Sequence, residues 1–247
     1  CYFHSKSDVG IGAFLSGGVD SGGIIGLTSK YSKVDAFTAV FSDFPNINES
    51  KYARMMVDKL GISHHESELS LGINDEFEKI IWHFDEPYAV SSGYSLYFLS
   101  KTAKSLGLKV MLTGDGADEI FGGYGRHDVK LHNLLSNPFY RKQYPVPKIL
   151  QTTNIWNCKI YRGLINLTNS DLQAYLSKSR YQPEILLPSL IDKDFFDTHI
   201  KNEYYKEEDF IKNINDTYSM LDNVNKRLII DIKTSLIDEM ITKVDRS

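Results

Sequence analysis

The first half of the chain alternates short apolar stretches with stretches of helical spacing, and this alternation limits the possible folds more than any other feature. Apolar runs at Val9–Leu15, Ala36–Phe41 and Leu108–Leu112 have the length and composition of buried strands, and a weaker candidate covers His64–Leu69. Segments with apolar residues at helical spacing separate them: Gly22–Lys30, Asn48–Leu60, Phe77–Phe84 and Tyr94–Leu106. Strands that alternate with helices predict an α/β fold, in which a parallel sheet is flanked by helices.

The character of the sequence changes beyond about residue 130. Prolines at 138, 145 and 147 indicate a loop, and the later residues are rich in Asn, Lys and Leu. Apolar residues recur there at helical spacing, for example Leu228, Ile229, Ile232, Leu236 and Ile237. We therefore expect an α/β region over residues 1–135 and a mainly helical region over residues 136–247.

Composition excludes several classes of protein. Of 247 residues, 42% are hydrophobic and 24% are charged, which excludes a disordered or fibrous chain. The net charge of −4 argues against a dedicated nucleic-acid binder. Two distant cysteines, Cys1 and Cys158, make neither a disulfide framework nor a four-ligand zinc site. With no membrane-length apolar run and no signal-peptide layout, we expect a cytoplasmic protein without a membrane partner.

A glycine-rich loop, Ser-Gly-Gly-Val-Asp-Ser from Ser16 to Ser21, follows the first predicted strand and precedes a helix. Gly17 and Gly18 lack side chains, so their N–H groups can approach an anion closely. The helix N-terminus adds the positive end of a dipole. The loop is not a Walker A motif, because no Gly-Lys-Ser/Thr follows it. We interpret it as a phosphate cradle in which Asp20 requires a hard cation such as Mg²⁺ beside the phosphates.

An acidic loop, Thr113 to Glu119, follows the fourth predicted strand. The carboxyl ends of parallel strands share one edge of a sheet, so this loop is expected beside the phosphate cradle. Its carboxylates, Asp115, Asp118 and Glu119, would repel phosphates unless they bind metal or exchange protons. Taken alone, the loop could equally be a calcium-like acidic turn or a capped helix start.

Two further segments carry weaker signals. His64 and His65 could bind metal, but adjacent residues on a strand point to opposite faces, which favours structural roles. The Asp85–Pro87 segment could shape a substrate pocket, and a helix end stopped by proline explains it equally well.

The order of these segments matches that of a known enzyme family. The Ser16–Ser21 loop resembles the pyrophosphate loop of the ATP pyrophosphatase (PP-loop) superfamily, and Thr113–Tyr124 resembles the second signature of the glutamine-hydrolysing asparagine synthetases. Shorter similar segments occur in the family's order: Asn48–Arg54, His64–Glu66, Asp85–Pro87 and Lys243–Ser247. The resemblance covers nearly the whole chain. It implies the adenine nucleotide alpha hydrolase-like fold, with residues 1–135 as the nucleotide-binding region.

The resemblance also implies a reaction. Such a synthetase domain adenylates the side-chain carboxylate of aspartate with MgATP, and ammonia then attacks the acyl-adenylate to give asparagine, AMP and pyrophosphate. The implied cofactors are ATP and Mg²⁺. The implied partners are small substrates and a glutaminase domain in the full-length protein, and a homodimer is left open.

The resemblance assigns roles to individual residues. Pyrophosphate would contact Ser16, Gly17, Gly18, Asp20 and Ser21, and the adenine and the rest of the nucleotide would contact Leu15, Val40, Thr113 and Gly114. Asp20 and Asp118 would be magnesium ligands. Asp115 would lie at the reacting acyl centre, and Lys243 would neutralise charge that develops on the phosphates.

Three departures from the family pattern leave alternatives open. Gly22 replaces a frequent serine, Asp115 replaces a frequent glutamate, and the glutaminase domain that precedes this region in the family is absent from this sequence. Together with the lack of an initiator Met and the stop at Ser247, this absence predicts a fragment, so Cys1 is expected to be an ordinary thiol. Alternatives are adenylation of another carboxylate, as in polysaccharide, antibiotic or β-lactam synthesis, and a non-catalytic nucleotide-binding module.

Overall fold

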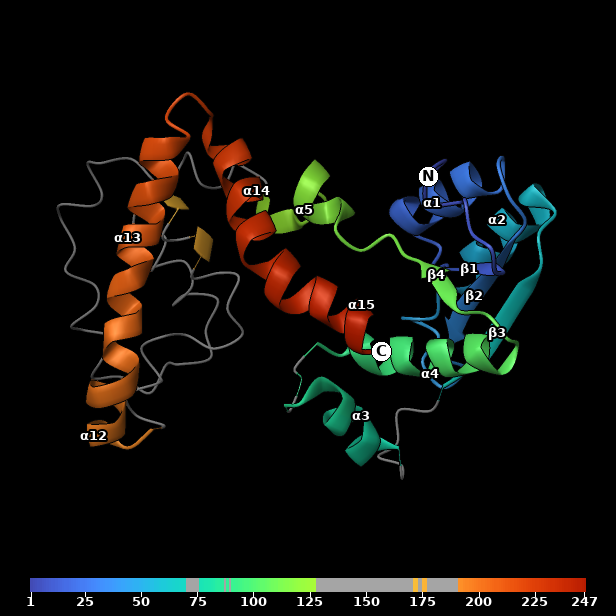
Figure 1. Cartoon of the computed structure of the whole chain (residues 1–247), viewed down its shortest axis with the longest axis horizontal. Coiled ribbons are helices and arrows are strands. Elements are labelled where there is room, and N and C mark those ends of the chain that lie inside the picture. Colours follow the sequence, from blue (N-terminus) through green and yellow to red (C-terminus); the bar gives the residue numbers. More distant parts are fainter. Residues whose placement is uncertain (70–75, 87, 89, 128–170, 173–174, 177–190) are drawn as a thin grey trace. The chain divides into compact units, whose positions relative to one another are not determined.

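The computed structural model describes residues 1–69, 76–86, 88, 90–127, 171–172, 175–176 and 191–247 (Figure 1). These residues form two compact units. The first consists of Cys1–Ala117 with Leu236–Ser247, and the second consists of Asp118–Ser235. The predicted boundary between residues 135 and 136 lies outside the described residues and stays a prediction.

The first unit is built on a four-stranded parallel sheet with the order β3-β2-β1-β4. Its strands are β1 (Ile11–Phe14), β2 (Val34–Val40), β3 (His64–Glu68) and β4 (Val110–Leu112). Each strand lies within the apolar run that predicted it or within two residues of it. The prediction of a parallel sheet flanked by helices is confirmed.

Helices cover both faces of this sheet (Figure 1). Helices α1 (Val19–Thr28) and α2 (Ser50–Leu60) pack on the face that carries the side chains of Ala13 and Ala36. Helix α4 (Ser92–Ser105) packs on the opposite face, against Phe14 and Phe37. Alternation of successive side chains along β1 explains why neighbours such as Ala13 and Phe14 belong to different core clusters.

The C-terminal residues of the chain belong to the first unit. A π-helical turn, η4 (Leu236–Ile241), leads into α15 (Thr242–Arg246), which contacts α4 and α3 (Phe77–Phe84). Val244 packs against the cluster around Phe14, and Arg246 forms an ion pair with Asp85 at the end of α3. These contacts hold Lys243 at a fixed place in the first unit.

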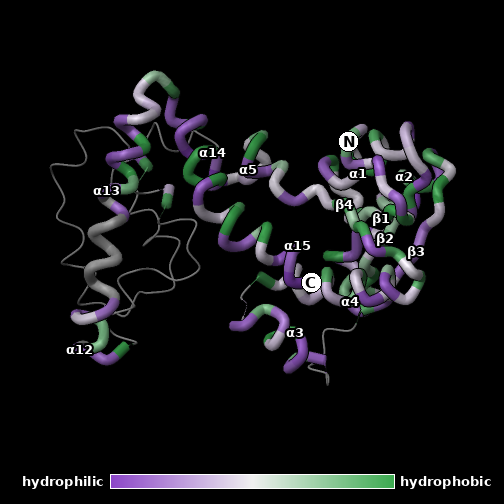
Figure 2. The backbone as a smooth tube through the Cα atoms, in the orientation of Figure 1, coloured by the Kyte–Doolittle hydropathy of each residue, from purple (hydrophilic) through white to green (hydrophobic). Residues whose placement is uncertain are grey.

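The second unit is helical in its described part. Its elements are α5 (Ala117–Phe121, which begins at the last residue of the first unit), the 3₁₀ turn η1 (Gly125–His127), α12 (Lys193–Phe195), the π turn η3 (Phe196–Ile200), α13 (Lys201–Thr217) and α14 (Asn223–Lys233). Hydrophobic and hydrophilic stretches alternate along α14 (Figure 2), as expected for a helix with one buried face. The helix starts at Asp222, whose carboxylate accepts a hydrogen bond from Asn225 N at 2.8 Å.

The helical spacing predicted through Leu236 and Ile237 is interrupted in the structure. Helix α14 ends at Lys233, and Thr234 has non-helical backbone angles, φ −126° and ψ −88°. The Thr234 hydroxyl donates to Ile230 O at 2.7 Å, which competes with continuation of the helix. The residues from Leu236 onwards belong to the first unit.

A buried carboxylate accepts several hydrogen bonds in the core of the second unit. Asp231 is fully buried, and its Oδ2 accepts hydrogen bonds from Tyr175 at 2.5 Å, His127 at 2.8 Å and Arg126 at 3.0 Å. Burial, together with the bond to Asp231, raises the pKa of Tyr175, which keeps its hydroxyl a donor. Asp231 thus ties α14 to the turn η1, which follows the acidic loop.

Among the helices of the described residues, none is both long and apolar enough to cross a membrane.

We predict that Asp231→Ala destabilises the second unit by about 3–5 kcal/mol, because the buried donors Tyr175 and His127 and the partly buried cation Arg126 lose their shared acceptor. Urea unfolding, with hydrogen exchange of the Ile230 amide as a local probe, measures the change. Asp216→Asn is the control, because Asp216 is exposed on α13. Equal stability of the two variants would contradict this assignment.

Candidate functional site

The loop Ser16–Ser21, called the pyrophosphate loop from here on, directly follows β1 and leads into α1. Ser21 Oγ lies 3.3 Å from Ser16 N, 3.1 Å from Ser16 Oγ and 3.3 Å from Gly18 O. Ser16, Gly18 and Asp20 are exposed, whereas Ser21 is buried. The buried Ser21 hydroxyl thus links Ser16 to Gly18 on the inner side of the loop, and the outer side of the loop is exposed to solvent.

Gly17 has a backbone conformation that other residues rarely adopt, with φ +88°. A Cβ at this position would also lie 2.8 Å from Tyr52 Cβ and 3.1 Å from Glu49 O. The start of α2 therefore packs directly behind the loop. The glycine that the sequence analysis assigned to anion binding is also required for this packing.

The structure brings the acidic loop against the pyrophosphate loop, as predicted from their positions after β4 and β1. A Cβ on Gly114 would lie 2.7 Å from Ser21 N and 3.0 Å from the carbonyl carbon of Asp20. Thr113 and Gly114 follow β4, the immediate neighbour of β1. Leu15 and Val40, the predicted adenine contacts, lie at the ends of β1 and β2 and are buried. All of these residues thus lie at the same edge of the sheet.

Lys243 and Asp115, which are 128 residues apart in the sequence, form an ion pair of 2.5 Å between Nζ and Oδ1. Lys243 is only 4% exposed, and its Nζ also lies 3.4 Å from Ser92 Oγ. The other carboxylate oxygen of Asp115 accepts a hydrogen bond from the Thr113 hydroxyl. The predicted catalytic residues therefore meet, and Thr113 orients the acid that pairs with the lysine.

Asp118 belongs to the second unit and is half-buried. A Cβ on Gly123 would lie 1.6 Å from Asp118 Oδ1, so a larger residue there would force the Asp118 carboxylate to move. Its neighbour Glu119 is buried and accepts a hydrogen bond of 2.6 Å from Tyr124. Burial, together with this bond, raises the pKa of Tyr124, so its hydroxyl remains a donor.

No group of three or more His, Cys, Asp or Glu side chains able to hold a metal ion occurs in the described part of the chain. A magnesium ion that accompanies ATP does not need one, since phosphate oxygens and water supply most of its ligands. The exposed carboxylate of Asp20, beside a glycine cradle, fits such an ion. The two histidines that could have bound metal make other contacts: His65 stacks on Phe37, and His64 bonds Thr38.

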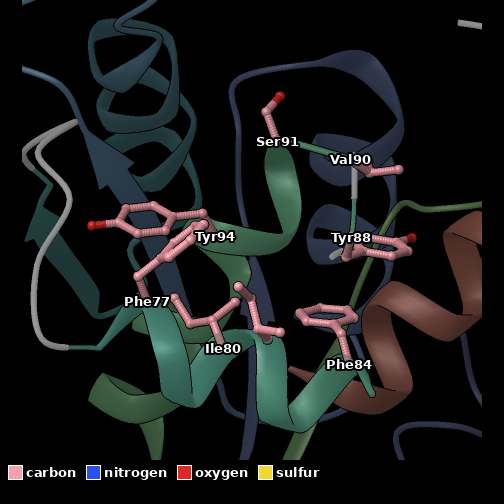
Figure 3. Close-up of a pocket in the computed structure, with 8 residues that line it drawn as sticks. Phe77, Ile80, Phe84, Tyr88, Val90, Ser91 and Tyr94 are labelled. Carbon is pink, nitrogen blue, oxygen red and sulfur yellow. The ribbon is translucent and has the colours of Figure 1, made fainter. Parts of the chain in front are cut away.

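The contacts that hold Lys243 in place were not predicted from the sequence. Tyr88 donates a hydrogen bond to the Glu239 carbonyl in η4, and its ring stacks on Phe84 at 4.4 Å between centroids (Figure 3). Asp85 ends α3 in the left-handed region, φ +60°, and binds Arg246. Among these residues, Asp85 and Arg246 lie in segments that resemble the family, Asp85–Pro87 and Lys243–Ser247, and Pro87 lies outside the described residues.

A cavity of about 230 Å³ lies between α3 and α4 (Figure 3). Its walls are apolar and aromatic, with Ile80, Phe84, Tyr88 and Tyr94 among them, and Ser91 is next to Ser92 of the Lys243 site. None of the side chains that line it is charged, so it does not suit a triphosphate.

We predict that Gly114→Ala weakens ATP binding roughly tenfold, because the added methyl group displaces the backbone at Ser21. Equilibrium binding of ATP to the purified chain measures the effect. Gly26→Ala in α1 is the matched control, since its Cβ would meet no atom within 4 Å. Alanine there removes a helical glycine and is expected to stabilise α1 by up to about 1 kcal/mol. Equal ATP affinity of the two variants would show that the close approach of the loops is not needed.

Comparison with known proteins identifies the family. A family model described as asparagine synthase matches residues 3–247. Asparagine synthetase (glutamine-hydrolysing) 1 of Bacillus subtilis is 28% identical over 98% of this chain, which covers 37% of that protein. A relative from Methanocaldococcus jannaschii with asparagine synthetase in its name is 30% identical over 98% of this chain, which covers 45% of it. The root asparagine synthetase of Pisum sativum is 36% identical over 48% of this chain, which covers 22% of it.

The chain therefore spans less than half the length of these relatives. Because the family match runs over nearly all of its residues, the chain belongs to the asparagine synthase family.

Proposed function

We propose that this chain is the synthetase part of an ATP-dependent amide ligase, which adenylates a carboxylate and transfers the acyl group to ammonia. The observation that carries the proposal is the ion pair between Lys243 and Asp115, formed next to the contact of Gly114 with the pyrophosphate loop. A lysine, an acid and a glycine cradle at one edge of the sheet match the needs of phosphate and acyl chemistry.

In the first step, an oxygen of the substrate carboxylate attacks the α-phosphorus of ATP, and the bond to pyrophosphate breaks. The N–H groups of Gly17 and Gly18, with the Ser16 hydroxyl, would hold the pyrophosphate, while Leu15 and Val40 would flank the adenine. Negative charge increases on the leaving pyrophosphate. Lys243 would stabilise that charge as it forms, and its burial strengthens the interaction.

In the second step, ammonia attacks the acyl carbon, AMP leaves, and the attacking nitrogen loses a proton. Asp115 is the acid nearest to Lys243 in the structure and is partly exposed. We assign it the role of stabilising the positive nitrogen or accepting its proton. Phosphates that bind Lys243 would provide the lysine with other partners and so free Asp115 for this role.

Mg²⁺ would be held by Asp20 and Asp118 together with phosphate oxygens, and it would neutralise part of the triphosphate charge.

Aspartate is the proposed acceptor, because the relatives are named asparagine synthetases. The uncharged, aromatic cavity, which Ser91 helps to line, favours a second candidate, a carboxylate with an apolar group. We infer that a glutaminase domain of the full-length protein supplies the ammonia, so the chain alone uses free ammonia.

We predict that turnover yields AMP and pyrophosphate, because the cradle holds the pyrophosphate and the acceptor attacks the α-phosphorus. Exchange of labelled pyrophosphate into ATP, screened over aspartate and over acids with apolar or aromatic groups, identifies the acceptor. Formation of ADP and phosphate would contradict adenylation. Absence of exchange with every acid would favour a non-catalytic nucleotide-binding module.

We also predict that Lys243 and Asp115 act in different half-reactions. Lys243→Ala should slow pyrophosphate exchange by about 10²–10⁴-fold with little change in ATP affinity. Asp115→Asn keeps a hydrogen-bond acceptor for Lys243, so it should retain much of the exchange while amide formation falls by a similar factor. Lys30→Ala, at an exposed site after α1, is the control. Equal loss of both half-reactions in the two site variants would show that the pair acts only as one binding unit.

A further inference from the structure

We propose that Thr38 and His64 are positioning residues that fix the first peptide group of the pyrophosphate loop. Neither residue belongs to the loop: Thr38 lies on β2 and His64 lies on β3. The geometry of this inference comes from hydrogen bonds within the first unit. Its expected effect on ATP binding rests on the proposed function.

Both backbone groups of Leu15, the residue before the loop, form hydrogen bonds with β2. Its N–H donates to Phe37 O at 2.8 Å, and its carbonyl accepts from the Thr38 hydroxyl at 2.8 Å. The registered pairing of β1 with β2 ends at Phe14 and Phe37. The Thr38 side chain therefore extends the attachment of β1 by one residue, to the point where the loop begins.

This attachment determines the direction of the first N–H of the loop. The carbonyl of Leu15 and the N–H of Ser16 belong to one planar peptide group, and in the trans form they point in opposite directions. Because Thr38 holds the carbonyl, the Ser16 N–H is directed the other way, towards Ser21 Oγ at 3.3 Å. Rotation of this peptide group would disturb both the loop and its closing serine.

His64 completes the arrangement by supplying a hydrogen to Thr38. Its Nε2 lies 2.9 Å from Thr38 Oγ1. The single hydroxyl hydrogen of Thr38 points to Leu15 O, so the histidine must be the donor, with its hydrogen on Nε2. Burial lowers the pKa of His64, which favours this neutral form. The Thr38 hydroxyl is thus fixed by a donor on one side and an acceptor on the other.

A bidentate ion pair keeps Glu66 engaged beside the histidine. Arg54 of α2 donates to both carboxylate oxygens of Glu66, at 2.6 and 2.7 Å. His64 Nδ1 lies 3.9 Å from Glu66, beyond hydrogen-bond distance. The pair also connects β3 to α2, the helix that packs behind Gly17. The contacts that hold the loop therefore come from β2, β3 and α2. None of these three elements carries a predicted phosphate-binding group.

The test compares variants that remove the hydrogen bonds with variants that retain them. Thr38→Val deletes the hydroxyl at nearly constant shape, and Thr38→Ser keeps it. His64→Phe keeps a ring without the donor. His65→Phe is the matched control, because His65 is the next residue on β3 but stacks on Phe37 on the other face of the sheet.

We expect Thr38→Val to weaken ATP binding and to accelerate hydrogen exchange of the Ser16 amide, each about tenfold. His64→Phe should show a smaller change in the same direction, while Thr38→Ser and His65→Phe should resemble the unchanged chain. The Ala36 amide, bonded to Ser63 O at 2.9 Å, is the internal reference for general loss of stability.

The two readouts separate this proposal from the proposed function. Faster exchange at Ser16 with an unchanged Ala36 supports the positioning role, and it does so whether or not the chain binds ATP. Equal acceleration at Ser16 and Ala36, or identical behaviour of Thr38→Val and Thr38→Ser, overturns it. If the unchanged chain binds no ATP, the proposed function fails, and the amide exchange still decides the role of Thr38.

Discussion

The ion pair between Lys243 and Asp115 is the interaction on which the proposed site depends. A lysine that is 4% exposed needs an anionic partner, because an unpaired charge in that environment is strongly destabilising. Asp115 provides that partner from a loop 128 residues away in the sequence. Helix α15 is held in place because the partly buried Val244 packs against the cluster around Phe14 and Arg246 binds Asp85. The packing of α15 and the ion pair with Asp115 thus fix the position of the Lys243 amino group.

The same edge of the sheet explains how a glycine loop and an acidic loop come to act together. Both follow adjacent parallel strands, and Gly114 permits their backbones to meet at Ser21. Thr113 directly follows β4, and its hydroxyl donates a hydrogen bond that orients Asp115. In the proposed reaction, this proximity lets one lysine stabilise the phosphates while one carboxylate is directed to the acyl centre.

Much of the fold and of the candidate site could be predicted from the sequence. The features that could not be predicted have physical reasons. The strands and the loops after them were predictable, because apolar runs bounded by glycine and serine are local signals. Gly61, the residue after the predicted helix Asn48–Leu60, adopts the left-handed conformation with φ +64° that commonly ends a helix. By contrast, the contacts of Tyr88 and Arg246 with distant backbone and side chains leave no local pattern. The break at Thr234 was also missed, because the apolar spacing continues through it while the backbone does not.

The positioning role of Thr38 could not be predicted for a similar reason. A threonine within an apolar strand has an ordinary β preference, and only the register of β2 with β1 and β3 reveals what its hydroxyl contacts.

The most direct test of the central claim is a crystal structure of the chain with Mg²⁺ and an ATP analogue whose bridging oxygen between the α- and β-phosphates is replaced by a methylene group. We expect the β- and γ-phosphates to lie against Ser16–Ser21, the adenine to lie between Leu15 and Val40, and Lys243 Nζ to lie within hydrogen-bond distance of a phosphate oxygen. Phosphates bound away from this loop, or a Lys243 that points away from them, would contradict the central claim.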